Sequence, residues 1–527
     1  MTRYHQAAKS TLIITFVTLV AGVLGFAQQT LTAYVFGAGK EIDAFVAART
    51  IPDIFTKILQ IGILSIVFVP IFVKYIHQNK EKEAWKIAVN LFNIISTVFV
   101  ILIVLGMILT PLIVKILVPG FSPPTQKLTV NLTLILFPAI LFNILTILGT
   151  SILYAFKRFT IPALIKLILP LVVILALLVF RQKLDVYILS WAFLATAILE
   201  FLVIFQALYK QGLRYSLSFN WRDPVIRKII ILVSPFIIST ILAQASTVTN
   251  RMLASELTSG SLSALYYAER IMKLVSQVFL FAIPIVSFPI FAEKIARGER
   301  QELLKAISLT IRMILFAIIP VSIGLVILRL PLTQIIFQRG EFTFQDTEAT
   351  AYALLFFTFG LFATGITNIL ANVFYSLEKT KILVKITVLV IAFNIALNFL
   401  LVRPLAHGGL ALATSLTNIL SLLLHSYFLT RYLPQIKSVL WDKYYLKILL
   451  PSLLMGIFLF LSKPLIYSHI NRSRLWDQSL ALLAVVISSA FLYLLCAYLV
   501  KLKEMKLILE LVRAKINQKF FQTNVQE

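Results

Sequence analysis

The 527-residue sequence has almost no cysteine and few charged residues. Cys496 is the only cysteine and lies in an apolar run, which excludes intrachain disulfides and metal sites built from cysteines. Charged residues make up 13% of the chain, against about 25% in an ordinary soluble domain. Hydrophobic residues make up 60%, and mean hydropathy is +0.94. A soluble globular protein is therefore excluded.

Motifs for catalysis and for nucleotide binding are also missing. The five histidines are dispersed, and the chain contains neither an HExxH stretch nor a GxxxxGK[ST] stretch for ATP. No pair of carboxylates has the spacing of a hydrolytic site. We expect no enzyme activity, no cofactor and no metal, so any transport must use an ion gradient, the membrane potential or the substrate gradient.

Long apolar runs fill the chain from Ser10 almost to Val500. A helix needs about 20 apolar residues to cross a bilayer, so the runs predict an all-α polytopic membrane protein with about 14 transmembrane helices. The first run is too long for a signal peptide, and we expect it to remain as a helix. The predicted spans are 10–35, 43–76, 85–109, 126–154, 159–180, 185–209, 226–256, 262–293, 303–328, 347–376, 382–402, 405–431, 445–465 and 476–500.

The formal net charge of +26 comes from basic residues spread over many loops. Nucleic-acid binding would instead gather them on one soluble domain. The loops with the most Lys and Arg are 74–86, 214–228 and 294–300. In the predicted topology all three fall on the side of the N-terminus, so the positive-inside rule predicts that both termini are cytoplasmic. Residues 501–521 mix apolar and basic positions, as in an amphipathic helix that binds anionic inner-leaflet lipids.

The sequence repeats itself at an offset of about 220 residues, in one orientation. Residues 44–49 match 265–270, 69–72 match 288–291, Pro111-Leu112 match Pro331-Leu332, and 153–157 match 374–378. Six helices per repeat give parallel repeats, which usually form two lobes around a central cavity and transport by rocking. We expect an N-terminal lobe at 1–221, a C-terminal lobe at 222–434, two further helices at 435–501 and a basic tail at 502–527.

Ionisable residues inside the apolar spans are the candidate site, because such groups are costly unless they face a cavity or a partner. Arg49, Asp53 and Lys57 share one face of the second span. Arg270 occupies the position in the second repeat that Arg49 has in the first. Paired guanidinium groups suit phosphate, which they bind through two oxygens at once. The alternative is that these charges pair with one another or reach the headgroups.

Four stretches carry a resemblance to a known family. They are Val23-Leu24-Gly25-Phe26-Ala27 with Phe36-Gly37-Ala38-Gly39 and Asp43-Ala44-Phe45; Phe68 to Phe72; Ser259-Gly260-Ser261 with Tyr266 to Arg270; and Phe337-Gln338-Arg339-Gly340-Glu341-Phe342-Thr343. The chain resembles the MurJ/MviN family of lipid II flippases, within the superfamily that also contains multidrug and polysaccharide exporters.

The resemblance implies a cationic cavity that takes a pyrophosphate and sugar headgroup, and a groove by the last two helices for the polyprenyl tail. Two family arginines are replaced here, by Gln28 and by Thr56 beside Lys57, while Arg270 matches. The candidate substrate-binding residues are Arg270, Arg49, Lys57, Glu269, Gln28, Asp43 and Arg251. Some members bind sodium, at positions that match Asn250, Asn394, Asn398 and Thr414 here. All four are neutral, so a cation there would lack a carboxylate.

The sequence thus predicts an inner-membrane flippase for lipid II, with lipid II and membrane lipids as partners and cell-wall synthases as further expected partners. A flippase for another polyprenyl-pyrophosphate glycan is the main alternative. A multidrug cation exporter fits less well, because its cavity should be acidic. A membrane scaffold of cell-wall synthesis that moves nothing is the alternative from another class.

Overall fold

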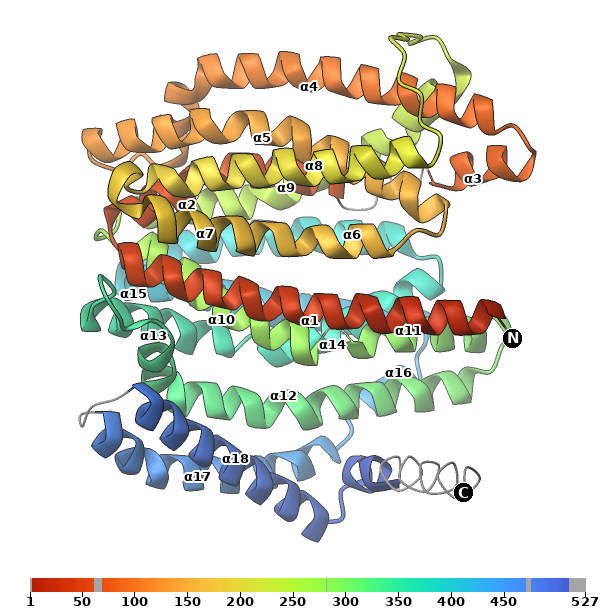
Figure 1. Ribbon diagram of the computed structural model, residues 1–527. Coiled ribbons are helices and arrows are strands. Elements are labelled where there is room, and N and C mark those ends of the chain that lie inside the picture. The colour runs from red at the N-terminus through yellow and green to blue at the C-terminus, as the bar shows by residue number, and fades with distance from the viewer. Residues whose placement is uncertain (1, 61–68, 281, 471–474, 511–527) are drawn as a thin grey trace, which may run out of the picture. The chain divides into compact units, whose positions relative to one another are not determined.

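The computed structural model describes every residue except 1, 61–68, 281, 471–474 and 511–527. Every regular element in the described part of the chain is a helix (Figure 1). The elements are α1 (Thr2–Phe36), α2 (Lys40–Gln60), α3 (Val69–His77), α4 (Glu81–Leu117), α5 (Pro123–Ala155), α6 (Thr160–Leu164), the 3-10 turn η2 (Ile165–Leu167), α7 (Ile168–Leu184), α8 (Tyr187–Lys210), α9 (Pro224–Ser255), α10 (Ser261–Phe279), α11 (Ala282–Ala296), α12 (Arg300–Phe337), α13 (Phe344–Thr358), α14 (Leu361–Ser376), α15 (Thr380–Tyr432), α16 (Ile436–Leu440), α17 (Tyr445–Ile470) and α18 (Leu475–Leu499). The predicted all-α membrane fold is confirmed.

Nine described helices are long and apolar enough to cross a membrane, or ten if the bent pair α13 and α14 forms one span. These two helices meet at 42°. The long helix α15 holds two of the predicted spans, and its backbone breaks at Ala406, where φ is 47° and ψ is −133°. The count of 14 spans stays a prediction.

Two predicted features fall partly outside the described residues. The expected span 43–76 is described as α2 and α3, and residues 61–68 between them lie outside that description. Of the expected amphipathic tail, residues 503–510 are helical, residues 501 and 502 are not, and residues from 511 on lie outside the description.

Helix boundaries recur along the chain with the period of the sequence repeat. The first residues of α2 and α10 are 221 positions apart, and those of α4 and α12 are 219 apart. Left-handed backbone conformations recur as well, at Lys157 and Glu378, each with φ of 58°, and at Asp185 and Ala406. Such conformations are uncommon outside glycine, so their recurrence at one offset reflects a duplicated backbone rather than chance similarity among apolar residues.

The chain forms two compact units. The first comprises Met1–Ser263 with Arg339–Asp346, and the second comprises Ala264–Gln338 with Thr347–Glu527. Helix α9, the first helix of the second repeat, thus belongs to the first unit. The lobe boundaries expected from the repeat stay a prediction.

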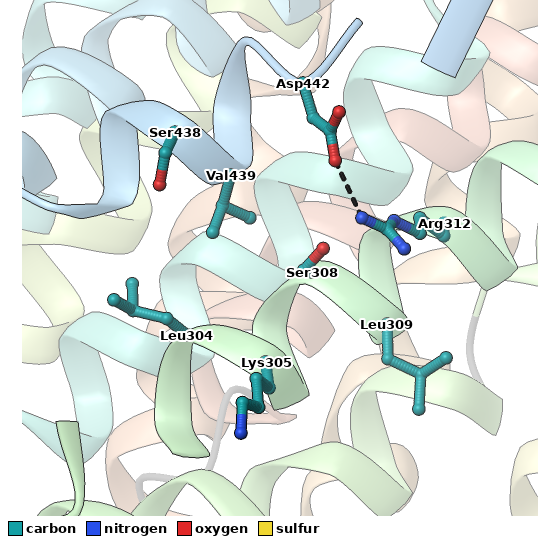
Figure 2. A pocket seen from close by; sticks show the side chains of 8 residues that line it. All are labelled: Leu304, Lys305, Ser308, Leu309, Arg312, Ser438, Val439 and Asp442. Carbon is teal, nitrogen blue, oxygen red and sulfur yellow. Dashed lines mark hydrogen bonds and ion pairs between the residues drawn. The ribbon is translucent and has the colours of Figure 1, made fainter. Parts of the chain in front are cut away.

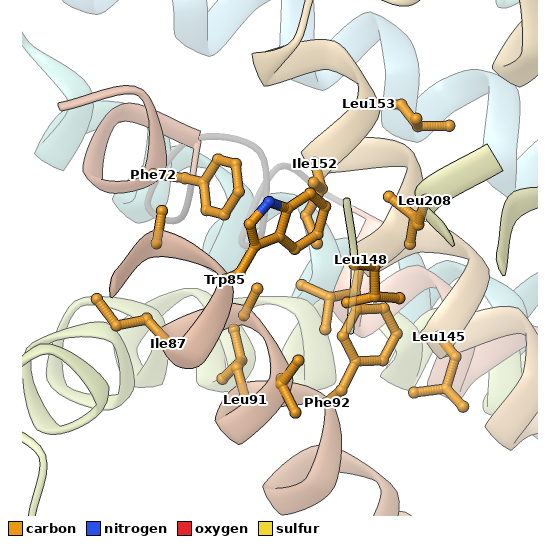
Figure 3. Close-up of a cluster of buried hydrophobic side chains, with 14 of the residues drawn as sticks. Phe72, Trp85, Ile87, Leu91, Phe92, Leu145, Leu148, Ile152, Leu153 and Leu208 are labelled. Atoms are coloured by element: carbon orange, nitrogen blue, oxygen red, sulfur yellow. The ribbon is translucent and has the colours of Figure 1, made fainter. Parts of the chain in front are cut away.

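In the first unit, α5 packs against α8, α2 and α4, while α7 packs against α8 and α1. One end of this unit is filled by a cluster of large apolar side chains (Figure 3). Trp85 of α4 stacks on Phe156 at 5.6 Å between ring centroids, and Phe72 of α3 meets Trp85 edge-on at 5.7 Å. Aromatic pairs in these geometries add about 0.5–1.5 kcal/mol beyond burial. The cluster fixes α3 to α4 and α5.

The segment that joins the two sequence repeats is bonded to α4. Asn90 donates to the Asn220 carbonyl at 2.9 Å, and the Asn220 N–H donates to Asn90 Oδ1 at 2.8 Å. Asp223 then accepts from the Val225 N–H at 2.8 Å, with Pro224 in the first turn, as expected at a helix start. These residues therefore fix the position at which α9 begins within the first unit.

In the second unit, α12 packs against α17, and α17 packs against α18. The hydroxyl of Tyr493 in α18 donates to the Phe316 carbonyl in α12 at 2.7 Å. Helices α17 and α18 also expose large apolar side chains, among them Phe460 and Phe491. Exposed apolar faces on long helices suit contact with lipid.

Candidate functional site

Asp43 lies in the first turn of α2 and is buried, with 3% of its surface exposed. Its carboxylate accepts hydrogen bonds from the Gly260 N–H, the Ser263 N–H and the Ser263 hydroxyl, each at 2.7 Å. The two N–H groups belong to the start of α10, where backbone donors lack partners within the helix. A carboxylate there is favoured by these donors and by the helix dipole. We call this set of contacts the Asp43 clamp.

Glycines allow the loops beside the Asp43 clamp to approach closely. Gly260 has φ of +91°, and a Cβ there would lie 2.5 Å from the carbonyl oxygen of Ala38. Gly340 has φ of +57°, and a Cβ there would clash with the Tyr34 carbonyl. The N–H of the next residue, Glu341, donates to that carbonyl at 3.0 Å. Three of the stretches that carry the family resemblance therefore meet within the first unit.

Arg49 lies in α2, six residues after Asp43. Its Nε is 3.3 Å from Asp53, and its Cζ lies 4.4 Å from the ring centroid of Phe193 in α8. The arginine side chain is 18% exposed, whereas that of Asp53 is 45% exposed. Pairing with an exposed carboxylate leaves the guanidinium able to exchange partners, because such pairs contribute only up to about 1 kcal/mol.

Gln28 occupies one position where the resemblance implies a lost arginine, and Lys57 lies beside the other, Thr56. Lys57 is exposed on α2, one turn beyond Asp53. Gln28 of α1 is 5% exposed, and its carbonyl accepts from the Thr32 hydroxyl at 2.9 Å. Their roles in substrate binding stay predictions, as do those of Arg49 and Asp43.

Arg270 and Glu269 lie on α10, in the part that belongs to the second unit. The Cζ of Arg270 lies 4.6 Å from the ring centroid of Tyr266, one turn earlier. Tyr266 is buried, Arg270 is half-buried and Glu269 is exposed. The buried ring supports the guanidinium on one face, in a cation–π contact that holds it in place. The predicted opposition of Arg49 and Arg270 stays a prediction.

Asn250 and Arg251 are both half-buried near the end of α9 in the first unit. The Asn250 side-chain oxygen is buried and has no hydrogen-bond partner among the described residues. A buried acceptor without a donor is costly, so it is available to a ligand or ion. The roles predicted for the two residues stay predictions.

Two further residues of the predicted cation set do come together, on α15. Asn398 donates to Asn394 Oδ1 at 3.1 Å, and Asn394 donates to the hydroxyl of Thr417 at 3.1 Å. Both asparagines are buried, and Asn398 Oδ1 has no partner among the described residues. Thr414 instead donates to the Leu410 carbonyl of its own helix. Sequence reasoning missed Thr417, which follows Thr414 by one turn.

Glu200 and Arg312 are two further charged residues within predicted apolar spans. Sequence reasoning did not include them among the candidate site residues. Glu200 lies on α8 one turn from Thr196 and from Ile204, and both of these are buried. Arg312 lies on α12 and pairs with Asp442 at 2.7 Å. Among the residues that the structure describes, no group of three or more His, Cys, Asp or Glu is arranged to hold a metal.

Sequence comparison finds one family and several relatives that span most of the chain. The family described as Lipid II flippase MurJ matches residues 32–501. A probable lipid II flippase MurJ of Rickettsia prowazekii is 30% identical over 497 residues, covering 94% of this chain and 97% of that one. A protein with the same description from Buchnera aphidicola is 29% identical and covers 86% of this chain and 89% of the relative.

Solved structures give the same relationship. A structure described as lipid II flippase MurJ in an inward closed conformation matches with a TM-score of 0.79 and 25% identity, covering 93% of this chain and 98% of that one. An inward-facing MATE family multidrug transporter of the MOP superfamily matches with a TM-score of 0.66 at 14% identity, covering 82% and 99%, which shows a shared fold alone. The family match over residues 32–501 and the 30% identity across nearly the whole chain show that this protein belongs to the MurJ family of lipid II flippases.

Proposed function

We propose that the protein moves lipid II, the lipid-linked peptidoglycan precursor, from the cytoplasmic to the outer leaflet of the bacterial inner membrane. The family match over residues 32–501 carries this proposal. The retained arginine on α10 supports it, because Arg270 stands at the repeat position of Arg49 and the Tyr266 ring holds its guanidinium in a defined position. Lipid II carries a pyrophosphate, which guanidinium groups bind well.

We assign pyrophosphate binding to Arg270 and Arg49, with Lys57 and Arg251 as further cations. Arg49 exchanges its exposed partner Asp53 for substrate phosphate at little cost. Lys57 is exposed one turn from Asp53 and supplies a second charge on the same helix face. Gln28 and Glu269 are assigned to the sugar or peptide part, because amide and carboxylate groups recognise hydroxyl and amide groups.

We propose that transport proceeds by alternating access, in which the binding site opens first to one side of the membrane and then to the other. The Asp43 clamp is the contact that opens and closes in this cycle. Its three hydrogen bonds join α2 to the start of α10, so separation of these helix ends requires all three to break together. Such a switch has two discrete states rather than a continuous range.

We infer from the loop charges that both termini lie in the cytoplasm. Lipid II and membrane lipids are then the partners, and contacts with cell-wall synthases remain an expectation. The Asn394, Asn398 and Thr417 cluster offers neutral oxygens alone, so we assign it no role in energy coupling.

Rescue of cells depleted of their own lipid II flippase tests the proposed function. The intact chain should restore growth and prevent accumulation of lipid II in the cytoplasmic leaflet, whereas an Arg49→Ala/Arg270→Ala double variant should do neither at equal abundance. Normal membrane abundance of the unsubstituted protein without rescue would contradict lipid II flipping. Rescue of cells that lack a flippase for a different polyprenyl-pyrophosphate glycan would then support the alternative substrate.

A further inference from the structure

A pocket of about 350 Å³ opens in the second unit, between the first half of α12 and the segment from α16 to the start of α17 (Figure 2). Its volume lies within the range of about 300–1,000 Å³ typical of small-molecule sites. Lys305, Ser308 and Arg312 line it from α12, where Ser308 is one turn from each of the others. Leu309 and Val439 supply apolar walls. The lining therefore combines two cations, two hydroxyls and an apolar surface with one carboxylate, that of Asp442.

Arg312 is held in place but retains binding capacity. Its Nη2 donates to Asp442 Oδ2 at 2.7 Å, and its Cζ lies 4.5 Å from the Tyr444 ring centroid. Its Nε is buried and has no hydrogen-bond partner among the described residues. An unmet donor of a charged group costs more than one of a neutral group, so an acceptor oxygen that enters here is favoured.

Lys305 is free to turn toward the pocket. Its side chain is 71% exposed, and its ammonium is 2.8 Å from Glu302, whose side chain is 50% exposed. In Figure 2 the Lys305 ammonium points away from Ser308 and Arg312. An exposed pair of this kind contributes up to about 1 kcal/mol, so an anion in the pocket can draw the lysine away from Glu302.

More positive charge lies around Tyr444, whose ring contacts Arg312. The ammonium groups of Lys447 and Lys503 lie 5.8 and 5.7 Å from the centroid of the Tyr444 ring. Tyr444 donates to Glu504 at 2.8 Å and accepts from the Lys503 N–H at 2.7 Å, so the C-terminal helical residues are fixed beside Tyr444. The loop charges assign this end of α12 to the cytoplasmic side, where phospholipid phosphates lie beside apolar chains.

We propose that this pocket binds the phosphodiester headgroup of an anionic phospholipid of the cytoplasmic leaflet. The phosphate lies between Lys305 and Arg312 and accepts from Arg312 Nε and from the Ser308 hydroxyl. The first part of an acyl chain lies along Leu309, which is 45% exposed. The bound lipid thereby joins α12 to the α16–α17 segment and stabilises the second unit.

The test measures binding of dioctanoyl phosphatidylglycerol to the purified full-length protein in neutral detergent, by native mass spectrometry and by thermal shift. Saturable binding with a rise in melting temperature is expected. Lys305→Gln and Ser308→Ala should each lower the affinity for this lipid. The double variant should lower it by about tenfold, as for loss of a charge-assisted contact. Lys506→Gln is the matched control, because Lys506 also forms an exposed pair, with Glu510, but lies outside the pocket.

Two further ligands identify the chemistry that is recognised. Dioctanoyl phosphatidylcholine should bind at least tenfold more weakly, and equal binding would overturn the requirement for net negative charge. Inorganic phosphate should give no comparable stabilisation, and equal stabilisation would show a site for free phosphate rather than for lipid. Unchanged phosphatidylglycerol affinity in the Lys305→Gln/Ser308→Ala protein would overturn the proposal. Because neither substitution breaks the Arg312–Asp442 pair, loss of folding is not expected to obscure the result.

Discussion

The carboxylate of Asp43 accepts hydrogen bonds from both the backbone N–H and the hydroxyl of Ser263, a residue 220 positions further along the chain. That separation equals the period of the internal repeat. The first turn of one helix is thus bonded to the first residues of its own duplicate, α10. A single carboxylate fixes the starts of two related helices.

Substitution of Asp43 by Asn should destabilise the first unit by about 2 kcal/mol, because buried hydrogen bonds to a charged group contribute about 1.5–3 kcal/mol. The melting temperature of the purified protein should fall by several degrees. Ser263→Ala should cost less, since both backbone donors remain. Asp53→Asn is the control, because its pair with Arg49 is partly exposed. Equal effects of Asp43→Asn and Asp53→Asn would refute the Asp43 clamp.

Substitution of Arg270 by Ala should abolish flipping and leave insertion and abundance near normal, because we propose that this guanidinium binds substrate. Arg270→Lys keeps the charge but loses the planar pair of donors, so partial activity is expected. Complementation and immunoblotting of membranes measure the two properties. If Arg270 serves packing, the Ala variant should instead lose abundance. Arg431→Ala is a suitable control, since that arginine contacts the exposed side of α15.

Sodium should not change the thermal stability of the protein at constant ionic strength. The Asn394 and Asn398 cluster offers neutral oxygens, whereas sodium and other hard cations favour carboxylates. Asn398→Asp should introduce sodium dependence, because Asn398 Oδ1 is buried and lacks a partner. Lithium and choline chloride serve as matched salts. Sodium-specific stabilisation of the unsubstituted protein would mean that neutral ligands suffice here.

Substitution of Glu200 by Gln should raise the melting temperature by a few degrees. No described hydrogen bond or ion pair engages this carboxyl group, and a charge within a membrane helix is costly. Exposed Glu348 gives the control Glu348→Gln. A stabilised protein that still rescues flippase-depleted cells is the expected result. Stabilisation with loss of rescue would instead identify Glu200 as a proton-carrying group.

A C-terminal fusion should fluoresce with a reporter that folds in the cytosol and remain inactive with one that requires the periplasm. The excess of Lys and Arg in the loops of one side predicts this outcome. The opposite pattern would mean either an odd number of spans or an inverted orientation of the whole chain. It would also place the phospholipid pocket at the other leaflet.

Sequence reasoning located the helical elements of the fold, while the predicted lobe boundaries stay a prediction. Apolar runs longer than 20 residues have one stable form in lipid, so the helices follow directly from composition. The offset of 220 residues also reappears in the backbone, down to the left-handed Lys157 and Glu378. The inclusion of α9 in the first unit could not be predicted, because it depends on packing contacts rather than on the pattern of the helix itself.

The sequence indicated which charged residues are candidates for the site, but not the side chains that they contact. Arg49 and Arg270 were found because guanidinium groups in apolar spans are rare. Their ring partners, Phe193 and Tyr266, carry no separate signal, since aromatic residues are common throughout the chain. The same rarity could have identified Arg312. Thr417 was missed because one turn of helix separates it from an equally suitable threonine.

The bond between the Tyr34 carbonyl and the Glu341 N–H has a consequence for biosynthesis. These residues are 307 positions apart, so at about 5–20 residues per second the ribosome needs on the order of 15–60 s to supply the second partner. Towards the end of that interval helices α1 to α9 have all been synthesised, but the last segment of their unit, Arg339–Asp346, has not. A nascent chain stalled between these two points should therefore be sensitive to proteases at residues 37–39, and protection should appear once Asp346 has left the ribosome.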